Sequence, residues 1–127
     1  MSNSKHPTSP HLQIYRLPLT ALLSITHRIT GVILAFGCLV LVWILAAAAY
    51  SATYYNAMLP HLQSWYGQVF TIGFIFALYL HFCNGVRHLI WDAGYGFELE
   101  TVDLTAKLAI VLAIILTVVT WTVGGAG

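Results

Sequence analysis

The feature that most constrains this chain is that no charged side chain occurs from Ile29 to Tyr55. A helix needs about 20 apolar residues to cross the hydrocarbon core of a bilayer, and this stretch is long enough. Of the 127 residues, 59% are hydrophobic and only 7% are charged, whereas soluble domains have about 25% charged residues. The chain is therefore expected to be an integral membrane protein.

Two more apolar runs follow, so the sequence predicts an all-α membrane protein with three transmembrane helices. We expect these helices at about residues 19–50, 63–93 and 103–123. The segment 51–63 is expected to be an uncharged loop, and Asp103 is suited to cap the third helix. Residues 1–17 are expected to form a polar arm, and residues 18–127 a single transmembrane domain without an internal repeat.

Basic residues predict the orientation of the chain, because Lys and Arg favour the inner side of a membrane. They stand before or at the start of the first helix and around an acidic loop at 94–103: Lys5, Arg16, Arg28, Arg87 and Lys107. We therefore expect the amino terminus and this loop on the inner side. Residues 1–10 have no signal-peptide or transit-peptide pattern, which favours a bacterial inner membrane with a cytoplasmic amino terminus. The basic residues form no stripe, which argues against nucleic acid binding.

The end of the second helix has the sequence His81-Phe-Cys-Asn-Gly-Val-Arg-His-Leu-Ile-Trp-Asp92. Four of its residues recur at helical spacing and so share one stripe: His81, Gly85, His88 and Asp92. A histidine inside a membrane helix is costly and usually functional. Gly85 leaves space beside His81 for a flat ligand, as haem ligation requires. A hydrogen bond from His81 to a neighbouring helix is the alternative that this stripe alone leaves open.

The first two turns of the first helix carry a second polar face at helical spacing: Ser24, His27, Arg28 and Gly31. An ion pair between Arg28 and Asp92 would explain both charges structurally, and anchoring at the interface would explain Arg87. The functional alternative is that the side chains of this face, together with His88, donate hydrogen bonds to the carbonyls of a quinone or to the propionates of a haem. One imidazole does not complete a low-spin haem site, so the second ligand is expected from another chain.

Three motifs carry a resemblance to a known family. They are Ser9-Pro-His-Leu-Gln-Ile-Tyr15, Ser24-Ile-Thr-His-Arg-Ile-Thr-Gly31 and His81-x-x-x-Gly-x-Arg-His-Leu-x-x-Asp92. In this order, and with three helices, they resemble the cytochrome b556 membrane-anchor subunits of succinate dehydrogenase. One departure is His6-Pro7, where the family typically has Arg-Pro. The resemblance implies a four-subunit complex with a second small anchor subunit, an iron–sulfur subunit and a flavoprotein subunit. The helices of this chain would be part of a larger heteromeric helix bundle.

The resemblance also implies roles for individual residues. His81 would be an axial ligand of haem b, and the other ligand would come from the second anchor subunit. His27 and His88 would lie near the haem propionates. The residues that line or adjoin the ubiquinone pocket would be Ser24, Arg28 and Asp92.

The function that follows from this resemblance is electron transfer from the iron–sulfur subunit to ubiquinone, while succinate is oxidised in the soluble subunits. Two alternatives remain open from the sequence. One is the anchor of a fumarate reductase-type complex, since a sequence does not set the direction of the reaction. The other is a haem-free structural membrane anchor.

Overall fold

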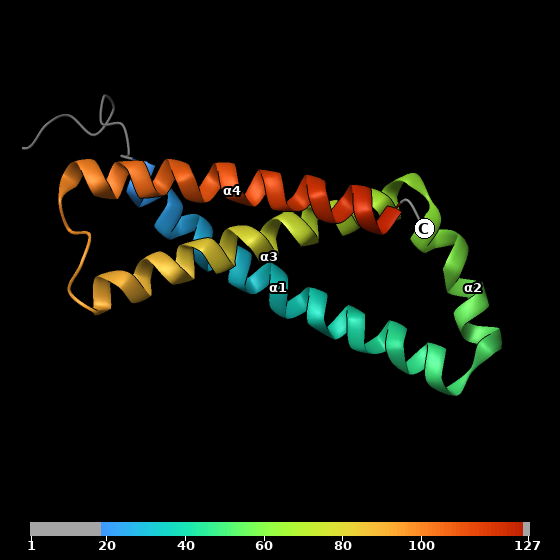
Figure 1. The fold of residues 1–127 in the computed structure, drawn as a ribbon. Coiled ribbons are helices and arrows are strands. Elements are labelled where there is room, and N and C mark those ends of the chain that lie inside the picture. The colour runs from blue at the N-terminus through green and yellow to red at the C-terminus, as the bar shows by residue number, and fades with distance from the viewer. Residues whose placement is uncertain (1–18, 126–127) are drawn as a thin grey trace, which may run out of the picture.

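The computed structural model describes residues 19–125, and within this range the chain is helical and contains no strand. The helices, in chain order, are α1 (Leu19–Tyr50), α2 (Ala52–Gln63), α3 (Trp65–Asp92) and α4 (Leu99–Gly125) (Figure 1). Three of them, α1, α3 and α4, are long and apolar enough to cross a membrane. The prediction of an all-α membrane protein with three spanning helices is therefore confirmed. The expected arm at residues 1–17 lies outside the described residues.

The helix α3 is central, because it packs against both α4 and α1. Figure 1 shows α4 running alongside α3, whereas α1 crosses α3 and then diverges from it toward α2. The side of α4 that is buried is made of small residues: Ala106, Ala109, Ala113 and Thr117. Small side chains allow two membrane helices to approach closely, which explains why α3 and α4 stay together.

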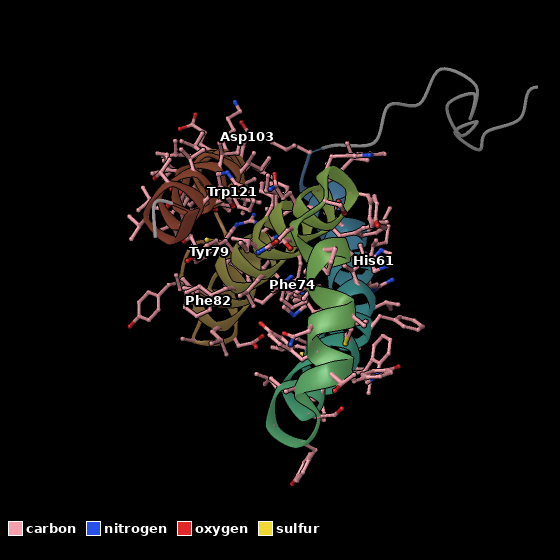
Figure 2. All side chains as sticks on the ribbon, turned by 90° about the vertical axis from the view of Figure 1, so that its right-hand side faces the viewer. His61, Phe74, Tyr79, Phe82, Asp103 and Trp121 are labelled. Carbon is pink, nitrogen blue, oxygen red and sulfur yellow. The ribbon has the colours of Figure 1, made fainter. Side chains whose placement is uncertain are left out.

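Two larger side chains of α3 fix its rotation between its neighbours. The Tyr79 hydroxyl forms a 2.6 Å hydrogen bond with the Thr120 hydroxyl of α4. The Phe74 ring packs so tightly onto α1 that a Cβ atom at Gly37 would lie 2.0 Å from it. In Figure 2, Tyr79 lies near α4 and Phe74 lies on the side of the bundle toward α1 and α2. Most of α1 after this contact is exposed, with Leu39 and Val42 among its exposed apolar side chains.

The expected loop at 51–63 was wrong, because residues 52–63 form the helix α2. Ser51 caps this helix, and its hydroxyl accepts a 3.2 Å hydrogen bond from the Tyr54 backbone N–H. Pro60 suggested a loop, but it lies in the last turn of α2, where its missing N–H removes a single bond of the helix.

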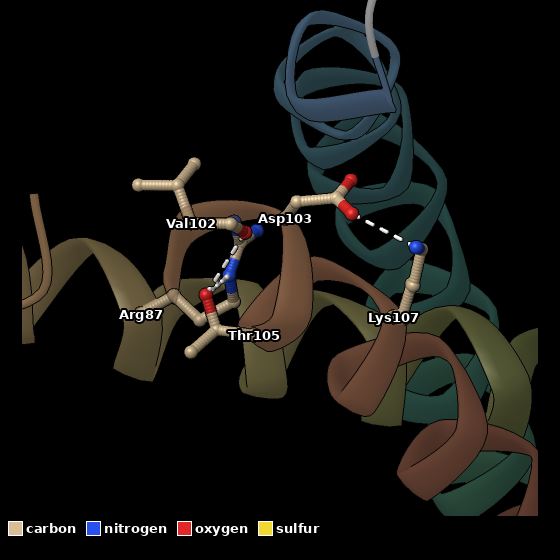
Figure 3. Close-up of polar contacts among 5 residues, drawn as sticks. All are labelled: Arg87, Val102, Asp103, Thr105 and Lys107. Atoms are coloured by element: carbon tan, nitrogen blue, oxygen red, sulfur yellow. Dashed lines mark hydrogen bonds and ion pairs between the residues drawn. The ribbon is translucent and has the colours of Figure 1, made fainter. Parts of the chain in front are cut away.

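The expected cap at Asp103 was also wrong, because α4 begins at Leu99. Gly94 and Gly96, with φ of 92° and 76°, turn the chain directly after α3, and the next helix starts soon afterward. Asp103 thus lies inside α4. Its carboxylate forms a 2.8 Å ion pair with Lys107, one turn further along (Figure 3).

Candidate functional site

Two histidines stack at the crossing of α1 and α3. The rings of His27 and His81 have centroids 4.0 Å apart and planes 4° from parallel. Glycines make the crossing close: a Cβ atom at Gly31 would lie 3.3 Å from Cε1 of His81, and one at Gly85 would lie 4.0 Å from Cε1 of His27. The two sequence motifs therefore meet ring against ring, and each has its glycine beside the other motif's histidine.

The third histidine of the stripe joins this cluster. His88 has its ring centroid 5.2 Å from that of His27, and its other side meets Trp91 edge-on at 5.0 Å. Nδ1 of His27 is buried and has no hydrogen-bond partner within the described residues. A buried polar atom without a partner is costly, so a hydrogen-bond partner for this nitrogen is expected from outside the described residues. The structure thus brings together all three histidines singled out in the sequence.

Arg87 lies beside the histidine cluster and joins α3 to the start of α4. Only 6% of its surface is exposed. Its guanidinium donates to Asn84 Oδ1 at 3.0 Å, and to Thr105 Oγ1 and the Val102 carbonyl at 3.3 Å each; Figure 3 shows the last two bonds. All these acceptors are neutral. Arg87 therefore brings a buried positive charge that no carboxylate within residues 19–125 neutralises.

A cavity of about 380 Å³ opens next to this arginine, between α1, α3 and the loop before α4. The residues that line it are Ala21, Ser24, Arg87, His88, Trp91, Phe97 and Val102. Ser24 and His88, both singled out in the sequence, therefore face one space. The cavity combines a hydroxyl, an imidazole and a guanidinium with apolar walls, which suits a ligand that has carbonyl oxygens on an apolar frame.

Two other predicted site residues stand apart from the cavity. Arg28 and Asp92 are both exposed and are not part of its lining. The ion pair between them that would have explained both charges is not formed, since the one ion pair of the described residues joins Lys107 and Asp103. Their side chains lie on the outer surface of the chain.

Sequence reasoning explained Arg87 by anchoring at the interface, whereas the structure has it in the cavity wall. The available signal was its position directly before His88, near the end of an apolar helix. The spacing of residues in the sequence does not reveal which neighbouring helix the Arg87 side chain faces. The direction of this side chain depends on how α3 packs on α4.

Comparisons with known proteins agree over nearly the whole chain. The model of a family described as succinate dehydrogenase/fumarate reductase transmembrane subunit matches residues 2–120. The succinate dehydrogenase cytochrome b556 subunit of Rickettsia felis is 40% identical over 118 residues, which cover 93% of this chain and 92% of the relative. That of Paracoccus denitrificans is 39% identical over 120 residues, covering 94% and 92%. The cytochrome b560 subunit of Reclinomonas americana is 39% identical over 124 residues, covering 94% and 86%.

Proposed function

This chain belongs to the succinate dehydrogenase/fumarate reductase transmembrane subunit family, and on that premise we propose that it binds haem b and ubiquinone as a membrane anchor of succinate dehydrogenase. The observation that supports this most directly is the stack of His27 on His81. In this stack, the motif on α1 and the motif on α3 meet at one position inside a membrane-spanning bundle. A purely structural anchor has no need to place three imidazoles together there.

His81 is proposed as the haem ligand in this chain. Its Nδ1 contacts the His27 carbonyl at 3.2 Å, whereas Nε2 is neither hydrogen-bonded nor enclosed within the described residues. The three histidines lie together, but among the described residues no group of three His, Cys, Asp or Glu side chains is arranged so that it could hold a bare metal ion. A haem iron takes its equatorial ligands from the porphyrin and needs only axial ones from protein, so His81 and a ligand from the second anchor subunit suffice.

The remaining histidines are proposed to receive the haem propionates. Nδ1 of His27 has no hydrogen-bond partner within the described residues, and the ring of His88 lies next to that of His27. When bound, haem b would supply one-electron transfer, and the chain's residues would hold and orient it.

The quinone is proposed to enter the cavity that contains Ser24. Its hydroxyl would donate to one quinone carbonyl, and the nearby guanidinium of Arg87 would stabilise the negative charge that develops on oxygen during reduction. An apolar groove of about 240 Å³ between α3 and α4 shares Arg87 with this cavity, and it suits the apolar tail of a lipid-soluble ligand.

Arg28 and Asp92 are proposed as quinone-site residues that a second subunit completes. Both are exposed at the end of the bundle where the cavity lies. A charged side chain that faces the hydrocarbon core of a membrane is costly, so a covering partner surface would explain the exposed position of Arg28. The partners proposed are the second small anchor, the iron–sulfur subunit and the flavoprotein subunit. The membrane would be a bacterial inner membrane, with the amino terminus in the cytoplasm.

The test is a reduced-minus-oxidised absorbance spectrum of the assembled, detergent-purified complex, for the wild type and for His81→Ala. We expect a low-spin b-type spectrum in the wild type that is lost or becomes high-spin in the variant, with all subunits still present. An unchanged spectrum in the variant would remove His81 from the ligand set. If neither sample contained haem, the chain would be a haem-free anchor.

A further inference from the structure

Two oxygen atoms of α1 contact Nδ1 of the His81 ring, whereas its other nitrogen, Nε2, has no hydrogen bond within the described residues. Nδ1 of His81 lies 3.1 Å from the Thr30 hydroxyl oxygen and 3.2 Å from the His27 carbonyl oxygen. The same Thr30 hydroxyl donates to the His27 carbonyl at 2.9 Å. The three groups thus form a closed triangle of hydrogen-bonding atoms, in which only 5% of the Thr30 surface is exposed.

The triangle determines where the hydrogen atoms lie. A carbonyl oxygen only accepts, so its contact with Nδ1 requires a hydrogen on Nδ1. The Thr30 hydroxyl hydrogen is used on the His27 carbonyl, which leaves a hydroxyl lone pair free to accept from Nδ1–H. In a neutral imidazole the other nitrogen then carries the lone pair. Nε2 of His81 is therefore left as the ligating atom.

We propose that Thr30 is a positioning residue for the haem ligand, which it fixes as the Nδ1–H tautomer with Nε2 turned toward the iron. This inference rests on the proposed ligation of haem by His81. Threonine suits the task, because its branched side chain is restricted at χ1 in a helix and its hydroxyl can bond the preceding turn. Gly31, the next residue, lets the ring come close enough for the bonds to form.

The bond to Thr30 also sets how strongly His81 donates to iron. A hydrogen-bond acceptor on the far nitrogen of a ligating histidine raises the basicity of the ligand and fixes the ring orientation. A more basic ligand stabilises ferric iron and lowers the midpoint potential. Loss of the Thr30 oxygen leaves Nδ1–H with only the longer contact to the His27 carbonyl. The midpoint potential is then expected to rise.

The experiment compares Thr30→Val with Thr30→Ser in the assembled complex. Valine has nearly the shape of threonine without the hydroxyl, whereas serine keeps it. The readouts are the haem midpoint potential from a redox titration followed by absorbance, and the electron paramagnetic resonance spectrum of the oxidised haem. We expect a higher potential and shifted resonance positions in Thr30→Val, and wild-type values in Thr30→Ser. If Thr30→Val does not assemble, Thr30→Ala provides the same comparison.

Thr26→Val is the matched control. Thr26 lies one turn earlier on α1, and its hydroxyl bonds the Leu22 carbonyl at 2.7 Å without contacting His81. This variant is expected to keep the wild-type potential. The proposal is overturned if Thr30→Val keeps both readouts unchanged, if Thr30→Ser shifts them as much as valine does, or if Thr26→Val has the same effect.

The variant His81→Ala separates this proposal from the proposed function. If it loses the low-spin haem while Thr30→Val leaves the potential unchanged, His81 is the ligand and only the role of Thr30 is wrong. If His81→Ala keeps a low-spin haem, the ligand assignment is wrong and the role of Thr30 is wrong with it.

Discussion

Ser24 of α1 and Arg87 of α3 line the same cavity, at the end of the bundle where the loop after α3 leads into α4. Arg28, which shares a helix face with Ser24 in the sequence pattern, is exposed and outside that lining. The two arginines therefore differ in environment: one is buried among neutral acceptors, and the other is open to a partner. Because of this difference, substitutions of the two arginines are expected to have different effects.

Substitution of Arg28 is expected to act on the quinone reaction alone. Arg28→Leu should lower succinate-to-quinone activity by up to about 100-fold, because it removes a donor that is proposed to stabilise charge on the quinone oxygen. Succinate oxidation by an artificial dye should stay near wild type, since that reaction occurs in the soluble subunits. The two activities are measured on the same purified complex. Ser24→Ala should show the same separation to a smaller degree. An equal loss of both activities would instead indicate a defect in assembly.

Substitution of Arg87 is expected to destabilise the bundle, in addition to lowering quinone reduction, in which its guanidinium is proposed to stabilise charge on oxygen. Arg87→Met removes one hydrogen bond within α3, to Asn84, and two that link α3 to Val102 and Thr105 of α4. A hydrogen bond to a charged group contributes about 1.5–3 kcal/mol, and relief of the buried charge offsets part of the loss, so we expect a net cost of about 2 kcal/mol. Thermal unfolding of the detergent-purified complex measures it.

The control for Arg87→Met is Lys107→Met. It breaks the exposed ion pair with Asp103, and exposed pairs contribute only about 0–1 kcal/mol. The unfolding temperature should therefore fall clearly for Arg87→Met and hardly for Lys107→Met. Equal shifts would mean that the buried hydrogen bonds of Arg87 add nothing to stability.

A methyl group at Gly31 is expected to disturb the haem site. In Gly31→Ala the new Cβ atom would lie 3.3 Å from Cε1 of His81, so the ring must move by a few tenths of an ångström. We expect a lower haem-to-protein ratio or an altered low-spin spectrum. Gly73→Ala is the control, since nothing lies within 4 Å of a Cβ atom there. Unchanged haem content and spectrum in Gly31→Ala would show that the ring is not confined at this position.

The contact between Gly37 and Phe74 is expected to exclude any side chain larger than glycine at position 37 of α1. A Cβ atom at Gly37 would lie 2.0 Å from the Phe74 ring, so Gly37→Ala forces the ring or the helix to shift. Overpacking of this kind costs about 1–3 kcal/mol, measured by thermal unfolding. Adding Phe74→Leu should recover part of the loss in the double variant. If the two substitutions are simply additive, the ring does not block the position.

Much of the fold could be predicted because membrane insertion depends on local composition. The uncharged run from Ile29 to Tyr55 is sufficient to indicate a spanning helix whatever packs beside it. The two errors of the fold prediction lay where local signals are weak. Residues 52–63 are less apolar than the spanning helices and contain Pro60, and the start of α4 depends on the turn made by Gly94 and Gly96.

The sequence by itself determined the spanning helices, the family and the histidines that gather at one end of the bundle, because hydropathy and helical spacing are properties of single segments. Only the tertiary structure decided how each helix is rotated about its axis. That rotation follows from close packing at Ala106 and Ala113 on α4 and at Gly31 on α1. It turns Arg87 into the cavity and stacks His81 on His27, because the energy of such contacts depends on two helices at once.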